Sequence, residues 1–234
     1  MTNEQMPAGG RGRGRPPTGG QTELPRQKLL EAALHAFSEL GYDGMSMRNL
    51  AQQLGISHGL LNLRFGTKRQ LWEVSVEYGL DKFRERMIRL PREGSLEDRF
   101  KLAVDQILEA IDTIPEMLRL LNNEGMTNST RLDHIAETIL AERYSRLEEV
   151  ILEGVGLGRL HETPVQLVTV LVAHGGGVLF GLKPLAVKLG LLTDGSAEEM
   201  DLRKRQIGDL LWRGLLRRED DPDRDAPLCE SKGR

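Results

Sequence analysis

The N-terminal fold of this chain is decided by residues 46–70, SMRNLAQQLGISHGLLNLRFGTKRQ. Ser46, Ser57 and Thr67 each stand just before a segment with the helical spacing of apolar residues, and a hydroxyl there can accept a hydrogen bond from a free N–H of the first turn. A glutamine three residues after Thr67 completes the pattern of a capping box. Gly55 lies between the first two segments, where glycine permits a tight turn. The stretch therefore predicts two short helices joined by a turn, and the start of a third.

The rest of the chain also has helical patterns. Apolar residues recur with the spacing of one helix face between Pro25 and Gly41, and the helix that opens at Thr67 extends to about Leu90. No stretch alternates apolar and polar residues as a strand would. The chain is therefore predicted to be all-α. Beyond Pro91 we expect helices at about 95–112, 115–126, 130–153, 163–189 and 196–218.

Charge is distributed unevenly along the chain. The 234 residues carry a net charge of −3, which by itself argues against a nucleic-acid-binding protein. Residues 1–90, however, contain 13 Lys and Arg against 9 Asp and Glu, whereas residues 91–234 contain 19 against 26. The N-terminal part is the one that can lie on phosphate, and the acidic remainder would be repelled by it.

Nothing in the sequence indicates export or membrane insertion. The single Cys229 cannot form an intramolecular disulfide, which suits a reducing cytoplasm. Residues 163–182 lack charge and have the length of a membrane span, but they contain Pro164 and three consecutive glycines from Gly175. We therefore expect a buried helix there, and a cytoplasmic, nucleoid-associated protein with no membrane partner.

The two short helices around Gly55 have the pattern of a helix-turn-helix. A DNA major groove about 12 Å wide admits one helix, which a neighbouring helix holds against the backbone. The outward residues of the second short helix are predicted to be His58, Gly59, Asn62 and Arg64. His and Asn can hydrogen-bond base edges or phosphates, and the glycine lets the backbone come close. These residues predict a DNA-binding head.

A family resemblance is carried by GYDGMSMRNLA (41–51), LGIS (54–57), GLLNLRF (59–65) and KRQL (68–71). In order and spacing these runs are similar to the DNA-binding domain of TetR-type (tetracycline-repressor-like) transcriptional regulators. The resemblance implies a three-helix head, a connecting fourth helix, and a helical body that binds a small effector and forms a homodimer. The parts expected are a disordered basic arm (1–22), a helix-turn-helix DNA-binding domain (23–72), a ligand-binding and dimerisation body (73–218) and a disordered tail (219–234).

The resemblance also places residues against double-stranded DNA. They lie at the starts of the second, third and fourth helices and on the third helix, and they are Ser46, Arg48, Ser57, His58, Gly59, Asn62, Arg64 and Lys68. Lys68 would meet phosphate with help from the free N–H groups of its helix. The chain departs from the family at Asn62, where Tyr is usual, at Arg64, where His is frequent, and at His58, where Lys or Arg is frequent. The aromatic phosphate contact is lost at Asn62, and the charge of Arg64 can compensate.

The arm adds a weaker motif. Residues 11–16, RGRGRP, resemble the core of an AT-hook, in which Arg13 and Arg15 would enter a narrow A·T-rich minor groove. The alternative interpretation is a solvated, disordered tail without a DNA contact.

In the body, the effector site is expected among the helices predicted between residues 95 and 189. Such pockets are mostly apolar with a few orienting polar groups. The candidates are Asn122, Asn123, Tyr144 and His174, since they are polar residues beside apolar runs. The abundance of aliphatic residues favours a hydrophobic or amphipathic ligand.

Two predicted helices of the body look suited to dimerisation. The helix at 196–218 carries an apolar stripe, and the uncharged helix at 163–189 is apolar nearly all round, so it must be covered on most sides. Two such helices from each of two subunits would make a four-helix interface. The interface residues expected are Gly176, Ile207, Leu211 and Leu215.

Two motifs imitate catalytic or metal sites. His174 and the three glycines after it copy the oxyanion-hole string of some esterases, but the chain has no Gly-x-Ser-x-Gly nucleophile elbow. His134 and Glu137 lie one helix turn apart, and two ligands are too few for a metal site. We therefore expect no enzyme activity, no cofactor and no metal.

Together these features predict a ligand-responsive transcriptional regulator, most simply a repressor. Its two recognition helices would enter successive major grooves about 34 Å apart on a pseudo-palindromic operator, and a small effector would release it. Two alternatives are a ligand-independent architectural protein that binds A·T-rich DNA, and a helical protein–protein adaptor.

Overall fold

The structure is a computed structural model that describes residues 24–87, 91, 93–141 and 146–218. The predicted arm and tail, together with Arg13, Arg15 and Tyr144, lie outside the described residues. The all-α prediction is confirmed, since the described segments form helices and one isolated β-bridge between Leu160 and Leu216.

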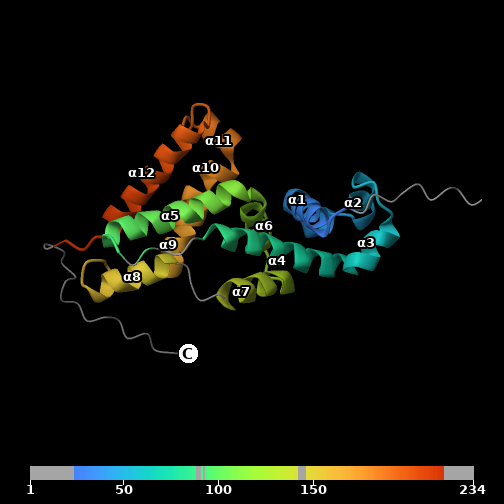
Figure 1. Cartoon of the computed structure of the whole chain (residues 1–234), viewed down its shortest axis with the longest axis horizontal. Coiled ribbons are helices and arrows are strands. Elements are labelled where there is room, and N and C mark those ends of the chain that lie inside the picture. The colour runs from blue at the N-terminus through green and yellow to red at the C-terminus, as the bar shows by residue number, and fades with distance from the viewer. Residues whose placement is uncertain (1–23, 88–90, 92, 142–145, 219–234) are drawn as a thin grey trace, which may run out of the picture.

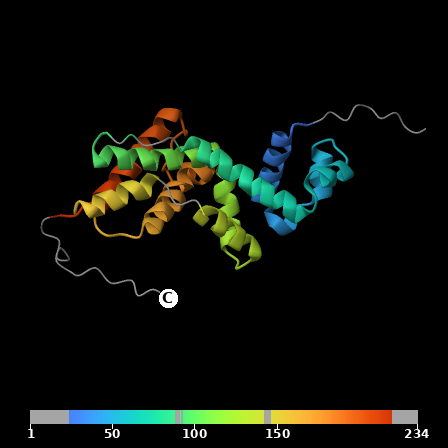
Figure 2. The ribbon, with the colours of Figure 1, turned by 60° about the horizontal axis from the view of Figure 1, so that its bottom comes forward.

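The head and the long helix after it comprise α1 (Arg26–Gly44), α2 (Met47–Gln53), α3 (His58–Phe65) and α4 (Lys68–Arg86). The body comprises α5 (Leu96–Thr113), α6 (Pro115–Gly125), α7 (Thr130–Ala141), α8 (Arg146–Gly156), α9 (Val165–Val170), the π-helix η1 (Leu171–Gly176), α10 (Val178–Gly181), α11 (Lys183–Lys188) and α12 (Ala197–Leu215). The molecule is elongated, with α2 and α3 at one end, α5, α8 and α12 at the other, and α4 running between them (Figures 1 and 2).

The helix starts of the head are those that the sequence predicts. The backbone N–H of Asn49 donates to Ser46 Oγ, and that of Leu60 donates to Ser57 Oγ at 3.1 Å. Thr67 begins α4 with both hydrogen bonds of the capping box. Gly55 adopts a φ of +66°, as the tight turn between α2 and α3 requires.

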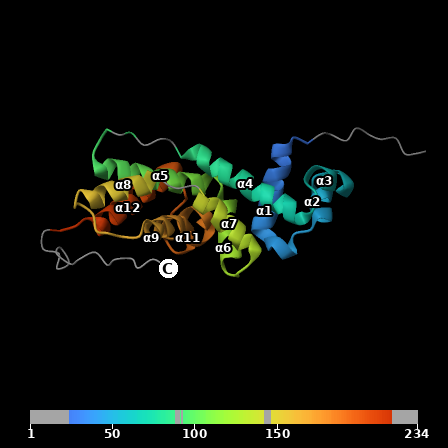
Figure 3. The same ribbon diagram turned by 90° about the horizontal axis from the view of Figure 1, so that it is seen from below.

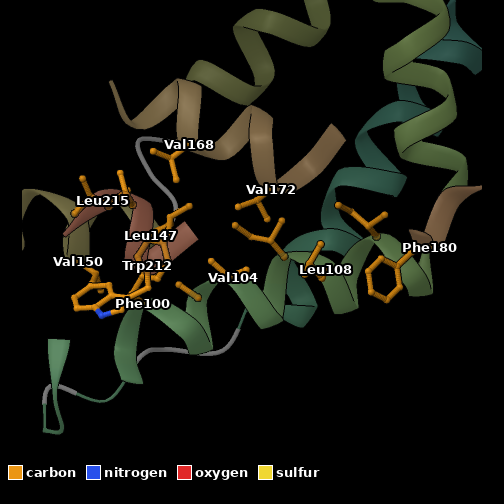
Figure 4. Close-up of a cluster of buried hydrophobic side chains, with 14 of the residues drawn as sticks. Phe100, Val104, Leu108, Leu147, Val150, Val168, Val172, Phe180, Trp212 and Leu215 are labelled. Carbon is orange, nitrogen blue, oxygen red and sulfur yellow. The ribbon is translucent and has the colours of Figure 1, made fainter. Parts of the chain in front are cut away.

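The body is organised around α5, which packs against α12 on one side and α8 on another (Figure 3). Phe100, Val104 and Leu108 follow one face of α5 into a cluster completed by α8, α9, η1, α10 and α12 (Figure 4). At one end of this cluster the rings of Phe100 and Trp212 lie 5.5 Å apart. Burial of these aromatic and aliphatic side chains is what holds the short helices of the body together.

The core of the head does not stop at the predicted boundary after residue 72, which lies inside α4. Met117 of α6 and Ile135 of α7 belong to the same buried cluster as the residues of α1 to α4. Gly79 of α4 is a point of close packing, because a Cβ there would lie 2.9 Å from Met117 Cγ and 3.0 Å from Leu34 Cδ2. The head is therefore anchored directly on the body through α4 and α6.

The single helix predicted at 163–189 is wrong. The segment is divided into α9, η1, α10 and α11, and Leu182 leaves the helical region with φ −125° and ψ 44°. A Cβ on Gly177 would collide with the carbonyl oxygen of Ala173, so the π-helix closes tightly on a residue without a side chain. α11 then begins at Lys183, and Pro184, which has no N–H to donate, occupies its first turn. In the described part of the chain no helix is both long and apolar enough to cross a membrane.

The helix predicted at 130–153 is described as α7 and α8, with residues 142–145 outside the description. The other predicted helices of the body agree with α5, α6 and α12 to within a few residues. In the first helix the predicted stop at Gly41 is a kink, where φ is +68°, and one further turn reaches Gly44.

Candidate nucleic-acid interface

The predicted recognition helix α3 lies at the end of the molecule that is farthest from α5 and α12 (Figure 1). Leu61 is fully buried and Phe65 nearly so, which turns one side of α3 into the core of the head. The opposite side presents His58, Gly59 and Asn62 to solvent, as the sequence predicts. This side is therefore free to enter a groove.

The predicted contacts at the helix starts are partly used within the chain. The Oγ atoms of Ser46 and Ser57 accept backbone hydrogen bonds, which leaves each hydroxyl hydrogen able to donate to a phosphate oxygen. Ser57 is exposed at the start of α3, and Arg48 is exposed in the first turn of α2. These positions suit contacts with the sugar-phosphate backbone of DNA on both sides of a groove.

Arg64 does not lie with the outward residues. Its Nη1 donates to the backbone carbonyl of Leu24 at 2.7 Å, and the side chain is half-buried. The guanidinium thus ties the C-terminal end of α3 to the segment before α1. Its predicted role as a DNA contact stays a prediction, while its observed role is to hold the recognition helix in place.

Lys68 occupies the first turn of α4, as expected, and its ammonium group is positioned by an aromatic ring. Its Nζ lies 4.7 Å from the centre of the Tyr42 ring and donates to the carbonyl of Asp43 at 3.3 Å. Arg131 approaches the same ring at 4.2 Å. Tyr42 is a positioning residue that sequence reasoning missed, and no local pattern would have revealed it, because the contact joins α1 to α4 and α7.

A second residue that was missed is Leu63, which is 83% exposed on α3. A helical periodicity could have found it, because residues 58 and 62, and likewise 59 and 63, are four apart and share a face. The outward set on α3 is therefore His58, Gly59, Asn62 and Leu63, with Leu63 in the place that was predicted for Arg64.

Residues 29–74 match the sequence model of the family described as bacterial regulatory proteins, tetR family. The HTH-type transcriptional regulator BetI of Paraburkholderia phytofirmans is 30% identical over 83 residues, which make up 36% of this chain and 43% of that protein. Residues 29–74 therefore form a DNA-binding domain of the TetR family. The sequence likeness to BetI spans less than half of that relative, and the residues matched by the family model lie in α1 to α4.

Solved structures extend the likeness to the TetR body. The TetR family transcriptional regulator PfmR from Thermus thermophilus has a TM-score of 0.58 at 21% identity, over 83% of this chain and 99% of that one. The ketosteroid transcriptional regulator KstR2 of Mycobacterium tuberculosis has a TM-score of 0.59 at 18% identity, over 85% and 98%. At these identities the likeness shows the fold. The family matched by residues 29–74 is one of bacterial regulatory proteins, in agreement with the predicted DNA-binding regulator.

The four residues predicted for the dimer interface all contact the core of their own chain, and their role in an interface stays a prediction. Gly176 is buried, and a Cβ there would lie 2.9 Å from Leu108 Cδ2 and 3.4 Å from Ile207. Leu215 is 8% exposed, and Ile207 and Leu211 lie partly buried against the body core. The apolar stripe of α12 thus covers α5 of its own chain, which a pattern of spacing cannot distinguish from a subunit contact.

Other apolar residues of the same segments remain uncovered. Exposed leucines and valines occur on α9, η1, α12 and the stretch around α11, and they are Leu167, Val170, Leu171, Leu182, Leu185, Val187, Leu189, Leu191, Leu202 and Leu210. These residues are the candidates for a dimer interface of the body.

Two of the effector candidates, Asn122 and Asn123, line an open groove of about 540 Å³ between head and body. The groove is bordered by α1, α6 and the segment of α10 and α11, with Ser38, Glu39, Arg119, Gly181, Leu182, Pro184 and Leu185 as its other lining residues. Two polar contacts join α1 to α6 beside it: Asn123 Nδ2 donates to the carbonyl of Ser38 at 3.0 Å, and Arg119 pairs with Glu39. His174 is half-buried in η1 and is not among the lining residues.

The described residues contain no group of three or more His, Cys, Asp and Glu that could hold a metal ion. The His134 ring lies 5.9 Å from that of Trp72, in an aromatic contact between α7 and α4.

Proposed function

We propose that this protein is a homodimeric repressor that binds a pseudo-palindromic operator and is released by a small, hydrophobic or amphipathic effector. The observation that carries the proposal is the exposed face of α3. A capped helix at the tip of the molecule presents polar side chains while Leu61 and Phe65 fix its other side. Two such helices about 34 Å apart would enter successive major grooves. We propose that the protein acts in the cytoplasm, on the DNA of the nucleoid.

Dimerisation is supported by the exposed apolar residues of α9, η1, α11 and α12. Where such exposed leucines and valines adjoin, they form the kind of apolar surface that is typical of a protein interface. A homodimer with a two-fold axis would bury this surface on both subunits at once and set the distance between the two heads.

Effector control is supported by the groove beside α1. Its lining combines the amides of Asn122 and Asn123 with the apolar side chains of Leu182 and Leu185, which suits a ligand with a polar group and an apolar part. Because the groove adjoins the contacts between α1 and α6, a ligand there would change the orientation of the head. Linkage then requires that effector and operator weaken each other's binding by the same factor.

Selection of binding sites from random duplexes with the full chain tests this function. A recovered palindrome is the expected result. A featureless A·T-rich pool would instead support an architectural DNA-binding protein, and the absence of duplex binding at low salt would support a protein–protein adaptor.

On the selected site, Lys68→Ala should weaken binding about tenfold and lower the slope of log K against log salt by about one, because one phosphate contact is lost. Lys82→Ala is the matched control, since it removes the same charge farther along α4 from a residue paired with Glu85 at 2.8 Å. An equal effect of the two variants would contradict the placement of the α4 N-terminus on DNA. His58→Ala should change which bases are selected.

A further inference from the structure

Leu63 is an anomaly of the recognition helix. Its neighbours Leu61 and Phe65 are buried in the core of the head, yet Leu63 is 83% exposed. Burial of a leucine ordinarily stabilises a fold, but the exposed Leu63 contributes no such stabilisation to the head. Among the described residues 24–87, Leu40 and Leu63 are the exposed large apolar side chains, and Leu40 lies on α1, outside the outward face of α3.

The surroundings of Leu63 leave its methyl groups open. Gly59 lies one turn before it, and a Cβ on Gly59 would have no atom within 4 Å. A side chain on a helix leans towards the preceding turn, where Gly59, four residues before Leu63, offers no side chain to cover it. The exposed His58 and Asn62 complete this face. The face thus combines two hydrogen-bonding side chains with one purely aliphatic side chain.

An aliphatic side chain can recognise little in a DNA groove. It makes no hydrogen bond to phosphate, and it gains from contact only where it meets another apolar group. In the major groove that group is the 5-methyl of thymine, whereas the other base edges present hydrogen-bond donors and acceptors. Asn62, in turn, carries the amide that can pair with N6 and N7 of adenine.

We propose that Leu63 is a specificity-determining residue that packs against a thymine 5-methyl group in each half-site. The inference rests on the proposed function, because it requires α3 to lie in the major groove. It predicts that every selected half-site carries thymine at one fixed position, and that the methyl group rather than the A·T pair is what Leu63 recognises.

Replacing that thymine by uracil tests the inference, because uracil lacks only the methyl group. On the selected duplex, we expect the wild-type chain to bind the uracil site about fourfold more weakly, the value for one methyl group removed from an apolar contact. Leu63→Ala should bind the thymine site more weakly and show nearly equal affinity for both sites. Because Leu63 is exposed, this variant should keep the circular dichroism and unfolding midpoint of the wild type.

Two controls separate the methyl group from other effects. Leu40→Ala, the same change on α1, should keep the fourfold preference. At the same position, 5-methylcytosine should bind about fourfold more tightly than cytosine for the wild type and equally for Leu63→Ala.

The outcomes separate this inference from the proposed function. If no duplex is selected, the proposed function fails and this inference falls with it. If a palindrome is selected but the wild type binds thymine and uracil sites equally, or Leu63→Ala keeps the full preference, only the role of Leu63 is overturned.

Discussion

The head and the body of this protein differ in how many large apolar side chains they expose. Within residues 24–87 the exposed large apolar side chains are Leu40 and Leu63, whereas α9, η1, α11 and α12 expose a group of leucines and valines. Isolated exposed apolar residues are ordinary, but a group of them marks an interface. The head therefore exposes few large apolar side chains beside the polar residues of α3, whereas the body exposes many.

The two regions nevertheless share a core. Met117 of α6 is buried in the same cluster as the helices of the head, beside Gly79 of α4. α6 therefore contacts both α1 and α4 directly, and α4 in turn contacts α3. The two regions therefore differ in the residues they expose, although they share a hydrophobic core.

The largest effect is expected on the dimer dissociation constant, when charges are placed on the exposed apolar residues of the body. Leu167→Glu combined with Leu171→Glu places two charges on the exposed apolar face of α9 and η1. If this face is the dimer interface, the carboxylates lose water without a partner, and the dimer dissociation constant should rise at least about 100-fold. Sedimentation velocity over a concentration series measures this.

Leu152→Glu is the matched control, because Leu152 is exposed on α8 and outside the proposed interface. It should leave the dimer intact. Equal association of the control and the double variant would show that the apolar face is not the interface.

A smaller effect tests the shared core. Gly79→Val puts a branched side chain into the contact with Met117 and Leu34, and the overpacking should lower the free energy of unfolding by about 1–3 kcal/mol. The buried Trp72 and Trp212 report on head and body separately, so unfolding is followed by fluorescence in Trp212→Phe and Trp72→Phe backgrounds. Both midpoints should fall together.

Gly156→Val serves as the reference, since a Cβ on Gly156 has no atom within 4 Å and Gly156 is the last residue of α8. A midpoint shift seen by Trp72 alone would mean that head and body unfold as separate units, against the common core.

The smallest effect concerns pH and the body. Backbone N–H groups of Thr193, Gly195 and Asp194 donate to the carboxylate of Glu199 and lower its pKa from 4.5 to about 2. Since the folded pKa lies below the unfolded one, the carboxylate stabilises the fold at pH values above about 4.5, and this contribution is lost as pH falls towards 2. Glu199→Gln should therefore be less stable than the wild type at pH 7, with a gap that narrows between pH 4.5 and 2.

Urea unfolding at pH 7 and pH 3 measures this gap. Glu198→Gln, the neighbouring change in the first turn of α12, should show a smaller gap at pH 7. A gap for Glu199→Gln that is as large at pH 3 as at pH 7 would contradict the role of these hydrogen bonds.

The head was largely predictable because its signals are local. Ser46, Ser57 and Thr67 cap helices through hydrogen bonds to residues three positions later, and such short-range contacts can be inferred from spacing alone. The exception is instructive. Arg64 was expected on the outward face, but it reaches back to Leu24, a partner forty residues away that no local pattern indicates.

The body was less predictable because its outcome depends on what packs beside it. The apolar stripe of α12 was assigned to a partner subunit, yet Leu215 is buried against the chain's own core. The uncharged segment 163–189 was expected to be one helix, yet it is broken at η1 and at Leu182. Helical spacing shows that a face must be covered, but it does not say by which surface.

By itself, the sequence determined the helical class, the capped helix-turn-helix and the exposed positions of His58, Gly59 and Asn62, because capping and periodicity act within a few residues. Only the tertiary structure decided that the head shares its core with α6, that Tyr42 positions Lys68, and that Leu63 is exposed beside Asn62. These features depend on contacts between segments far apart in the chain, and their geometry exists only once the helices have packed.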